Sequence, residues 1–383
     1  MSTLSLDPRA GGRQTDSRDF MPLHGIDHIE LWVGNAAQAA YHLRHAFGFT
    51  EVAYAGLETG QRDRVSHVLQ QGRIRLVLTG ALADGTEIGA HQRRHGDGVK
   101  RIALSVPSAE AAYREAVARG AAGLRVPYEL RDGDGIVHIA EIAAYGDTVH
   151  TFVERGDYAG TFLPGFVDVA HDGDAMTPPP PTLLAGIDHV VANVELGAMD
   201  RWVKFYEDVF GMTELIHFSD EAISTEYSAL MSKVVTSGDG RVKFPINEPA
   251  QSARKSQIDE YLEFYGGPGV QHIAVSTTDI VRTVEALQAR GVAFLRTPES
   301  YYDGVPARVG AIDQSLEDLR RLGILVDRDD EGYLLQIFTK PLGDRPTLFL
   351  EIIERHGARG FGEGNFKALF EAIEREQALR GNL

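Results

Sequence analysis

Two histidines and one glutamate in the second half of the chain are placed where they could hold a metal ion. His189 follows Asp188 in an apolar stretch, His272 lies in another, and Glu351 stands inside the run Leu348–Ile353. A carboxylate among such apolar neighbours is costly to bury unless it is paired or bound to a metal. Two imidazoles and one carboxylate that leave coordination positions open are typical of iron(II) sites that also bind oxygen and a substrate.

Each of these three residues also has a purely structural interpretation. A histidine that follows an aspartate in a strand is often a hydrogen-bonded core residue, and the chain contains 14 histidines. Glu351 could instead pair with Arg355 or Lys340. The candidate ligands lie 83 and 79 residues apart, a spacing that matches no local metal-binding motif. Spacing alone therefore leaves the structural interpretation open.

The composition narrows the possible ligands and partners. The chain has no cysteine, so disulfides, thiolate metal sites and cysteine nucleophiles are excluded, and a metal must be held by oxygen and nitrogen. There are 55 acidic residues against 38 lysines and arginines, a net charge of -17 that argues against nucleic acid as a partner. Neither a signal peptide nor an apolar run of membrane-spanning length is present, so we expect a cytoplasmic protein that does not bind a membrane.

The two halves of the 383-residue chain repeat each other on either side of a proline-rich linker at 171–182. Gly25–His28 reappears 161 positions later as Gly186–His189, and Gly98–Ala103 reappears 171 positions later as Gly269–Ala274. A duplicated domain explains such ordered matches. We therefore expect a flexible arm at 1–20, a structural domain at 21–170 and a catalytic, iron-binding domain at 183–383.

Hydrophobic periodicity predicts alternating strands and helices in the second half. The predicted strands span 187–194, 270–276, 333–339 and 348–353, and the predicted helices span 199–210 and 279–290. A strand, a helix and then several strands, repeated, indicate an α+β fold with helices outside a curved sheet.

The C-terminus carries a separate helix signal. We expect a helix over 365–381, capped by Asn365, with an apolar stripe of Phe366, Leu369, Phe370 and Ile373. The glycine-rich segment 357–364 precedes it and could be a hinge. The pattern fits either a lid over a site or a terminal helix that is simply docked.

The repeat bears on how many metal sites there are. Aligning the halves places His28 opposite His189, Arg101 opposite His272 and Glu154 opposite Glu351. An arginine at a ligand position repels a metal ion, so one site per chain, in the second half, is expected. His28 and Glu154 could pair with Arg101 or with other neighbours.

Several motifs, taken together, resemble the 4-hydroxyphenylpyruvate dioxygenase family. They run in the family's order over nearly all of 186–383, and the first half looks similar more loosely. The motifs are Gly186–His189, Phe244–Pro249, Lys255–Ile258, Gly269–His272, Leu335–Pro341, Phe349–Arg355 and Gly360–Phe366.

The resemblance implies paired βαβββ units of the vicinal-oxygen-chelate (glyoxalase-like) type in both domains. It implies one Fe(II) per chain, held by His189, His272 and Glu351. The implied reaction converts 4-hydroxyphenylpyruvate and O2 to homogentisate and CO2, a step in tyrosine and phenylalanine breakdown. Because the substrate carries its own 2-oxo acid, no separate 2-oxoglutarate is needed. The family commonly forms homodimers or homotetramers, so a homo-oligomer is expected.

The resemblance also implies which residues surround the substrate. It gives catalytic roles to Ser228, Asn247, Gln257 and Gln336, and it places Gln271, Phe338, Phe349, Phe361 and Asn365 against the substrate. Neutral amides and a hydroxyl can hydrogen-bond a phenol without the cost of burying charge. Without the resemblance, Asn247 is equally a turn residue, Ser228 a plain strand hydroxyl and Phe338 core material.

Three other functions are compatible with parts of this pattern. Hydroxymandelate synthase uses the same substrate and iron site but hydroxylates the benzylic carbon; the intact segments Pro245–Pro249 and around Phe361 look more like the ring-hydroxylating enzyme. An extradiol catechol dioxygenase would share the fold and the type of ligands without releasing CO2. A metal-free binding protein of this fold would have lost a ligand, whereas all three candidates are present.

Overall fold

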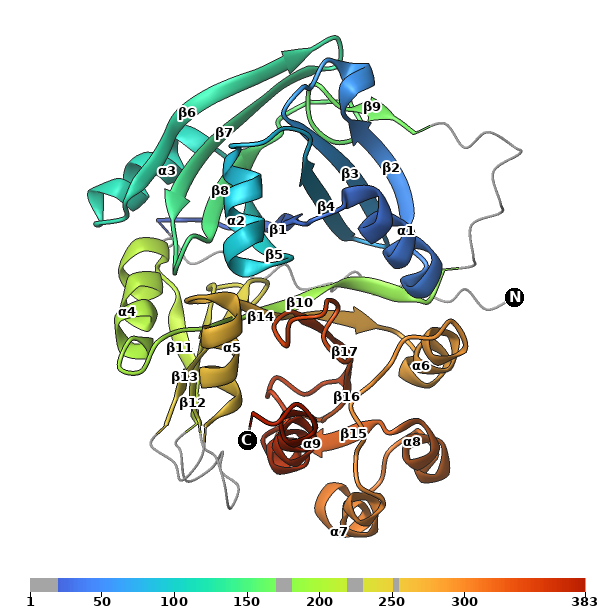
Figure 1. Ribbon diagram of the computed structural model, residues 1–383. Coiled ribbons are helices and arrows are strands. Elements are labelled where there is room, and N and C mark those ends of the chain that lie inside the picture. The colour runs from blue at the N-terminus through green and yellow to red at the C-terminus, as the bar shows by residue number, and fades with distance from the viewer. Residues whose placement is uncertain (1–19, 170–180, 219–229, 251–254, 383) are drawn as a thin grey trace, which may run out of the picture.

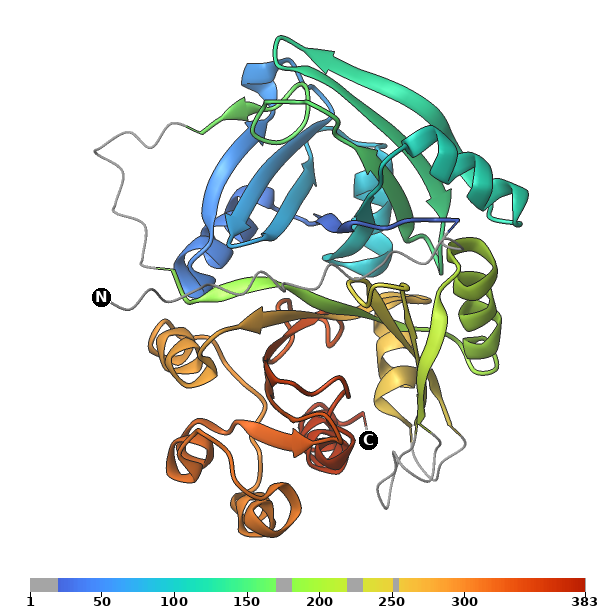
Figure 2. The ribbon, with the colours of Figure 1, turned by 180° about the vertical axis from the view of Figure 1, so that it is seen from behind.

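The chain folds into two halves, each built around one curved sheet with helices packed against it, as Figures 1 and 2 show from opposite sides. The structure is a computed structural model and describes residues 20–169, 181–218, 230–250 and 255–382. All of the predicted arm except Phe20, and most of the linker at 171–182, lie outside the described residues. No helix in the described part of the chain is both long and apolar enough to cross a membrane.

The first half contributes a nine-stranded sheet and three α-helices. The sheet has the order β6-β7-β8-β5-β1-β4-β3-β2-β9. In chain order the elements are β1 (Gly25–Trp32), α1 (Ala36–Phe47), β2 (Thr50–Ala55), η1 (Leu57–Thr59), β3 (Arg64–Gln71), β4 (Ile74–Ala81), α2 (Glu87–His95), β5 (Gly98–Ser105), α3 (Ala109–Ala118), β6 (Gly123–Asp132), β7 (Gly135–Ala143), β8 (Val149–Glu154) and β9 (Val167–Asp168).

The second half contributes an eight-stranded sheet of order β11-β12-β13-β10-β14-β17-β16-β15. Its elements are β10 (Leu184–Asn193), α4 (Met199–Phe210), β11 (Thr213–Phe218), β12 (Leu230–Thr236), β13 (Lys243–Pro249), α5 (Gln257–Tyr265), β14 (Gly269–Thr277), α6 (Ile280–Ala289), η2 (Glu299–Gly304), α7 (Val305–Val309), α8 (Leu316–Leu322), β15 (Leu325–Arg328), β16 (Tyr333–Phe338), β17 (Phe349–His356), η3 (Glu363–Asn365) and α9 (Phe366–Leu379).

Each half consists of two βαβββ units joined at their first strands. In the first half β1 pairs with β5, and in the second half β10 pairs with β14, both antiparallel. Each first strand also pairs in parallel with the last strand of its own unit, so β1 lies beside β4 and β10 beside β13. This is the α+β, glyoxalase-like arrangement that the sequence predicts.

The helices form where apolar stripes and end signals agree. In α4, Val203, Tyr206 and Phe210 are buried on one face, and the helix ends at Gly211, whose φ of 65° suits a residue without a side chain. The predicted helix at 279–290 is α6, with Asp279 as its N-cap. The predicted strands correspond to β10, β14, β16 and β17.

One apolar core runs through both halves, so the two sheets support each other. Buried residues of β1 and β5, such as Ile29 and Ile102, belong to the same cluster as Val190 of β10 and Ile273 of β14. Polar contacts also cross between the halves: the Arg73 backbone N–H donates to the Ala185 carbonyl over 2.7 Å. The central strands that carry the candidate ligands are therefore packed against the sheet of the first half.

Strand pairing corrects one alignment drawn from the sequence. Ala103 in β5 corresponds to Ala274 in β14, and the parallel neighbour of Ala103 is Thr151, whereas that of Ala274 is Glu351. Thr151, not Glu154, therefore occupies the position of Glu351. The counterpart of Glu154 is Glu354. Each accepts a hydrogen bond from the first backbone N–H of the helix in its own unit, α3 or α6, over 2.8 and 2.6 Å.

Candidate metal centre

Three adjacent central strands bring the three candidate ligands together. His189 lies on β10, His272 on β14 and Glu351 on β17. In the antiparallel pair, Val191 of β10 stands opposite His272, and in the parallel pair Glu351 stands beside Ala274. Residues far apart in the sequence thus meet on one face of the sheet, as the sequence predicts.

The ligand atoms converge at distances suited to a shared ion. The Glu351 Oε2 atom lies 3.5 Å from His189 Nε2 and 3.2 Å from His272 Nε2. All three side chains are buried, with exposures of 3%, 8% and 3% for His189, His272 and Glu351. Neither alternative partner competes for Glu351, because Arg355 pairs with Asp188 and Lys340 pairs with Glu376.

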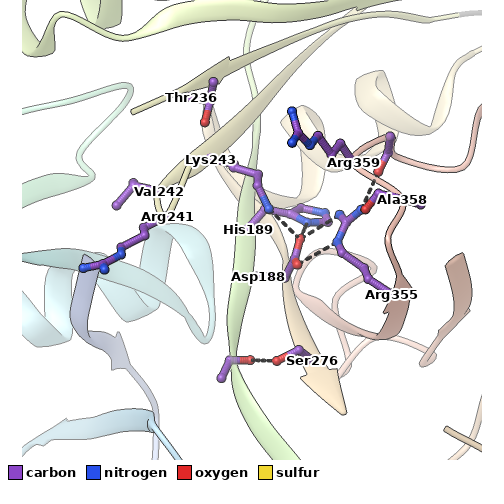
Figure 3. Close-up of polar contacts among 12 residues, drawn as sticks. Asp188, His189, Thr236, Arg241, Val242, Lys243, Ser276, Arg355, Ala358 and Arg359 are labelled. Carbon is purple, nitrogen blue, oxygen red and sulfur yellow. Dashed lines mark hydrogen bonds and ion pairs between the residues drawn. The ribbon is translucent and has the colours of Figure 1, made fainter. Parts of the chain in front are cut away.

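The outer nitrogen of each imidazole is held by a neighbouring side chain. His189 Nδ1 donates to Asp188 Oδ1 over 2.8 Å, and His272 Nδ1 donates to Gln271 Oε1 over 2.9 Å. With Nδ1 engaged in this way, the other ring nitrogen, Nε2, faces Glu351 and is the one available to a metal. Figure 3 shows Asp188 beneath the His189 ring and bound on its other side by Arg355. Such outer partners fix the ring orientation in protein metal sites.

The charges around the ligands suit a cation. Burial by itself would raise the pKa of Glu351, but the contacts with the two histidines outweigh it and lower the pKa to about 2, so the carboxylate is ionised. Burial lowers the pKa of His272, which favours the neutral ring that binds metals. Burial also opposes protonation of His189, yet Asp188 and Glu351 raise its pKa, so a bound metal would displace a proton there.

A second group with metal-ligand chemistry lies in the first half and is less suitable. His91 and His95 of α2 meet Asp147, with His91 Nδ1 2.9 Å and His95 Nε2 3.4 Å from Asp147 Oδ2. The Lys100 amino group lies 3.5 Å from the same carboxylate oxygen. A cation is therefore already beside this carboxylate and would repel a metal ion. Both groups offer two imidazole nitrogens and one carboxylate, a donor set that suits a divalent transition metal, so the neighbouring lysine is what makes the first-half group less suitable.

A cavity opens directly onto the three ligands, with about 570 Å³ of empty space between its lining atoms and its open mouth. Its apolar wall includes Phe338 of β16, Phe349 of β17 and Phe361 of the loop before α9. The ring of Phe349 stacks on His272 with centroids 4.8 Å apart, and the rings of Phe361 and His189 pack edge to face with centroids 4.9 Å apart. The amide groups of Asn247, Gln257, Gln271 and Gln336 also line it. It can therefore hold an aromatic compound beside the metal.

The C-terminal helix closes one side of this cavity. The predicted stripe of Phe366, Leu369, Phe370 and Ile373 lines the cavity. In Figure 1, α9 lies between the two arms of its sheet, with β12 and β13 on one side and β15 and β16 on the other. Arg380, just beyond the helix, donates to Glu260 of α5 over 2.6 Å. The helix is therefore both a wall of the site and docked on α5.

Comparison with known proteins is consistent along the chain. Residues 18–170 match the family model described as hydroxyphenylpyruvate dioxygenase, N-terminal, and residues 186–337 match the glyoxalase/bleomycin resistance protein/dioxygenase superfamily. The chain is 48% identical over 368 residues to 4-hydroxyphenylpyruvate dioxygenase of Yarrowia lipolytica, covering 94% of this chain and 93% of that protein. It is 46% identical to that of Dictyostelium discoideum, covering 94% of this chain and 100% of that protein.

The chain belongs to the 4-hydroxyphenylpyruvate dioxygenase family. Membership implies a metal cofactor, and the residues of the second half fit one. Among solved structures, a mutant of 4-hydroxymandelate synthase from Streptomyces coelicolor is similar, with a TM-score of 0.83 and 37% identity, covering 93% of this chain and 100% of that one. The resemblance seen in the sequence is therefore confirmed at the level of the family.

Most of the pocket residues predicted from the sequence line the cavity of this family member. Gln336, Gln257, Asn247 and the three phenylalanines line the cavity, and Asn247 lies within β13 instead of in a turn. Gln271 lines it too, although its side-chain oxygen is engaged by His272. Ser228 falls outside the described residues.

Asn365 has a different role from the one predicted. Its backbone is helical and its side chain makes no capping hydrogen bond, because the turn η3 already precedes α9. Its fully buried amide instead accepts from the Tyr301 hydroxyl over 2.5 Å and donates to Gln336 Oε1 over 3.3 Å. Asn365 thus stands at the N-cap position of α9 as predicted, but its side chain binds Tyr301 and Gln336 instead of capping the helix.

Two features of the cavity were not predicted from the sequence: the side chain of Ser232 in its wall, and the extent of the wall that α9 provides. Ser232 of β12 is the strand partner of Asn247, and its side chain lines the cavity. Its position follows from the pairing of β12 with β13, which no short motif reveals. For α9 the signal was present, since its apolar stripe is the cavity wall.

Proposed function

We propose that the chain is an Fe(II)-dependent 4-hydroxyphenylpyruvate dioxygenase that converts its substrate and O2 to homogentisate and CO2. The iron would be held by His189, His272 and Glu351. The observation that carries this proposal is the convergence of two Nε2 atoms and one carboxylate, 3.5 and 3.2 Å apart, at the floor of an aromatic cavity. Three protein ligands leave positions open for the substrate and for oxygen.

Iron(II) suits this donor set better than a soft or a hard ion would. The site offers imidazole nitrogen and carboxylate oxygen, and the chain has no cysteine. When bound, the iron supplies a common point at which the 2-oxo acid and O2 are activated. The protein's own contribution is to fix the two rings through Asp188 and Gln271 and to keep Glu351 ionised.

The cavity wall supports an aromatic substrate with one polar end. Phe338, Phe349 and Phe361 offer ring faces and edges to the substrate ring, next to the ligands. Asn247 and Gln257 offer neutral hydrogen-bonding groups that can meet a phenol. Asn247 Nδ2 also donates to Asn193 Oδ1 over 3.3 Å, which holds its amide in place. Closure of the cavity by α9 would exclude bulk water from the reaction.

The wider organisation follows from the same assignment. Residues 21–170 would be a structural domain and 183–383 the catalytic one, since Arg101 replaces a ligand in the first half. Arg101 is half-buried and donates to Glu30 over 2.8 Å and to Glu141 over 3.3 Å. We expect a cytoplasmic homodimer or homotetramer; gel filtration with light scattering would check the oligomer.

Hydroxymandelate synthase is the second candidate, because a structure of that enzyme is 37% identical and superimposes well. The relatives at 46–48% identity favour the ring-hydroxylating enzyme. The test is to load the protein with Fe(II), add 4-hydroxyphenylpyruvate and O2, and identify the products. Homogentisate with CO2 supports the proposal, and 4-hydroxymandelate with CO2 would replace it with the second candidate. Turnover of catechols without CO2 would reject both.

A further inference from the structure

The Asp188 carboxylate lies at the centre of a buried set of contacts behind the metal site (Figure 3). It accepts from His189 Nδ1 over 2.8 Å and from two nitrogens of Arg355, Nε and Nη2, each over 2.8 Å. The Lys243 amino group lies 3.6 Å away. Two parallel bonds from one guanidinium fix both the position and the plane of the carboxylate.

The first half contains a second copy of these contacts. Asp27 accepts from His28 Nδ1 over 2.6 Å and from Arg155 through two nitrogens, each over 2.7 Å. Arg75 lies 3.9 Å from Asp27, in the place of Lys243. Arg75 stands four residues before Thr79, the β4 partner of the last residue of β1. Lys243 stands four residues before Asn247, the β13 partner of the last residue of β10. The two cations therefore occupy equivalent positions.

An aromatic ring completes both copies. The rings of Phe361 and His189 pack edge to face with centroids 4.9 Å apart, and the rings of Phe162 and His28 do the same at 5.0 Å. The guanidinium of Arg355 and that of Arg155 each lie 5.5 Å from the centre of the corresponding phenylalanine ring.

The arginine also fastens the segment that carries the phenylalanine. Arg355 Nη1 donates to the Gly360 carbonyl over 2.6 Å, next to Phe361. Arg155 Nη1 donates to the carbonyl of Phe162 itself. Through one arginine, the carboxylate behind the histidine is therefore linked to the loop that carries the aromatic ring.

Of the two copies of these contacts, only the one in the second half lies beside a complete set of candidate metal ligands. In the second half His189 faces His272 and Glu351, whereas the equivalent positions in the first half hold Arg101 and Thr151. The frame of aspartate, arginine and phenylalanine around a histidine thus exists without metal ligands in the first half. Its contribution to folding can be measured there, separately from any contribution to metal binding.

We propose that Asp188 and Arg355 are positioning residues that couple metal affinity to substrate binding. Asp188 holds the Nδ1 proton of His189, so that Nε2 presents its lone pair to the metal. Arg355 holds Asp188 in plane and also holds the loop of Phe361. This proposal rests on the metal site of the proposed function. Loss of such an outer partner typically weakens metal binding tenfold to a hundredfold.

The test compares Asp188→Asn with its matched control, Asp27→Asn. Dissociation constants for Fe(II) and for Co(II), which resists oxidation, would be measured by anaerobic competition with a chelator. Unfolding of the metal-free proteins would be measured in urea. We expect both variants to lose similar stability, and only Asp188→Asn to lose tenfold or more in metal affinity. Equal affinity for Asp188→Asn, Asp27→Asn and the unmodified protein would overturn the proposal.

Arginine variants test the link to the substrate loop and serve if the asparagine variants do not fold. Arg355→Lys keeps the charge but cannot make two parallel bonds, and Arg155→Lys is its control. We expect Arg355→Lys alone to weaken metal binding and to raise the KM for 4-hydroxyphenylpyruvate. Weaker metal binding with an unchanged KM would overturn the coupling. If the unmodified protein binds no metal, the proposed function fails. If it binds metal but the variants bind equally well, only the positioning role of Asp188 and Arg355 fails.

Discussion

Thr151 occupies in the first sheet the position that Glu351 occupies in the second. Each is the parallel-strand neighbour of an alanine, Ala103 or Ala274, at matching points of the repeat. A hydroxyl cannot replace the charge of a carboxylate, and Arg101 replaces the second histidine. The first half therefore retains the fold and one histidine of the metal site without its ligand set.

Replacing His28 with alanine should leave iron content and turnover close to those of the unmodified protein. His28 contacts Asp27 and Phe162 and has no metal-ligand partners at the equivalent positions. The loss of a buried ring should reduce the free energy of unfolding by about 2–4 kcal/mol. Iron analysis and steady-state kinetics would check this. Loss of iron in this variant would show that the metal binds in the first half and would contradict the account.

Replacing Phe361 with alanine should impair substrate binding more than folding. Its ring lines the cavity and contacts His189, so its loss should raise KM roughly tenfold, the equivalent of about 1.4 kcal/mol. Phe162→Ala removes the corresponding ring of the first half and should leave KM unchanged. Equal effects of the two variants on KM would show that Phe361 is only core material.

Replacing Gly362 with alanine should reduce turnover by displacing Gln336. A Cβ atom at this position would lie 2.0 Å from Gln336 Oε1, and the φ of 78° adds strain. Gly310 has a similar φ of 71°, and an added Cβ would meet nothing within 4 Å. Gly310→Ala therefore tests the effect of backbone strain without a displaced side chain. We expect kcat to fall about tenfold to a hundredfold for Gly362→Ala only. Equal kcat values in both variants would mean that Gln336 has no role in turnover.

His150 should make the protein sensitive to moderate acid. It is fully buried between the halves, where its ring packs against Phe210 and Phe244 and bonds the Tyr206 hydroxyl over 2.8 Å. Burial lowers the pKa of His150 from 6.5 to about 4. Between these values the unfolded chain binds a proton that the folded protein excludes, so stability falls as the pH is lowered.

Because of His150, the free energy of unfolding should fall by about 3 kcal/mol as the pH is lowered from 6.5 to 4. Urea unfolding across this range would measure it, with His150→Gln as the non-titrating variant. The dependence on pH should be shallower in His150→Gln. Parallel curves for the two proteins would show that His150 does not contribute.

Much of the site was predictable because its residues lie in strongly patterned strands. Glu351 stands within an apolar run, and a buried carboxylate there demands a partner. The repeat of Gly186–His189 and Gly25–His28 indicated two equivalent domains. The residue types therefore indicated the duplication and the candidate ligands, and the family resemblance chose the metal-binding interpretation of those ligands.

The register between the halves was not predictable in the same way. The offset between equivalent residues is 171 at Gly98 and Gly269 but 200 at Thr151 and Glu351, because the second half inserts η2, α7 and α8 before β15. Matching Glu154 to Glu351 as acid to acid missed this change. Only the pairing of β5 with β8 and of β14 with β17 fixes the register.

The most direct test of the metal site is the iron content and turnover of Glu351→Ala, compared with Thr151→Ala. Both substitutions stand at the same position of their sheets. We predict that Thr151→Ala binds one iron per chain and forms homogentisate, whereas Glu351→Ala loses iron or turnover. A Glu351→Ala protein with full iron and full activity would contradict the assignment of His189, His272 and Glu351 as the metal centre.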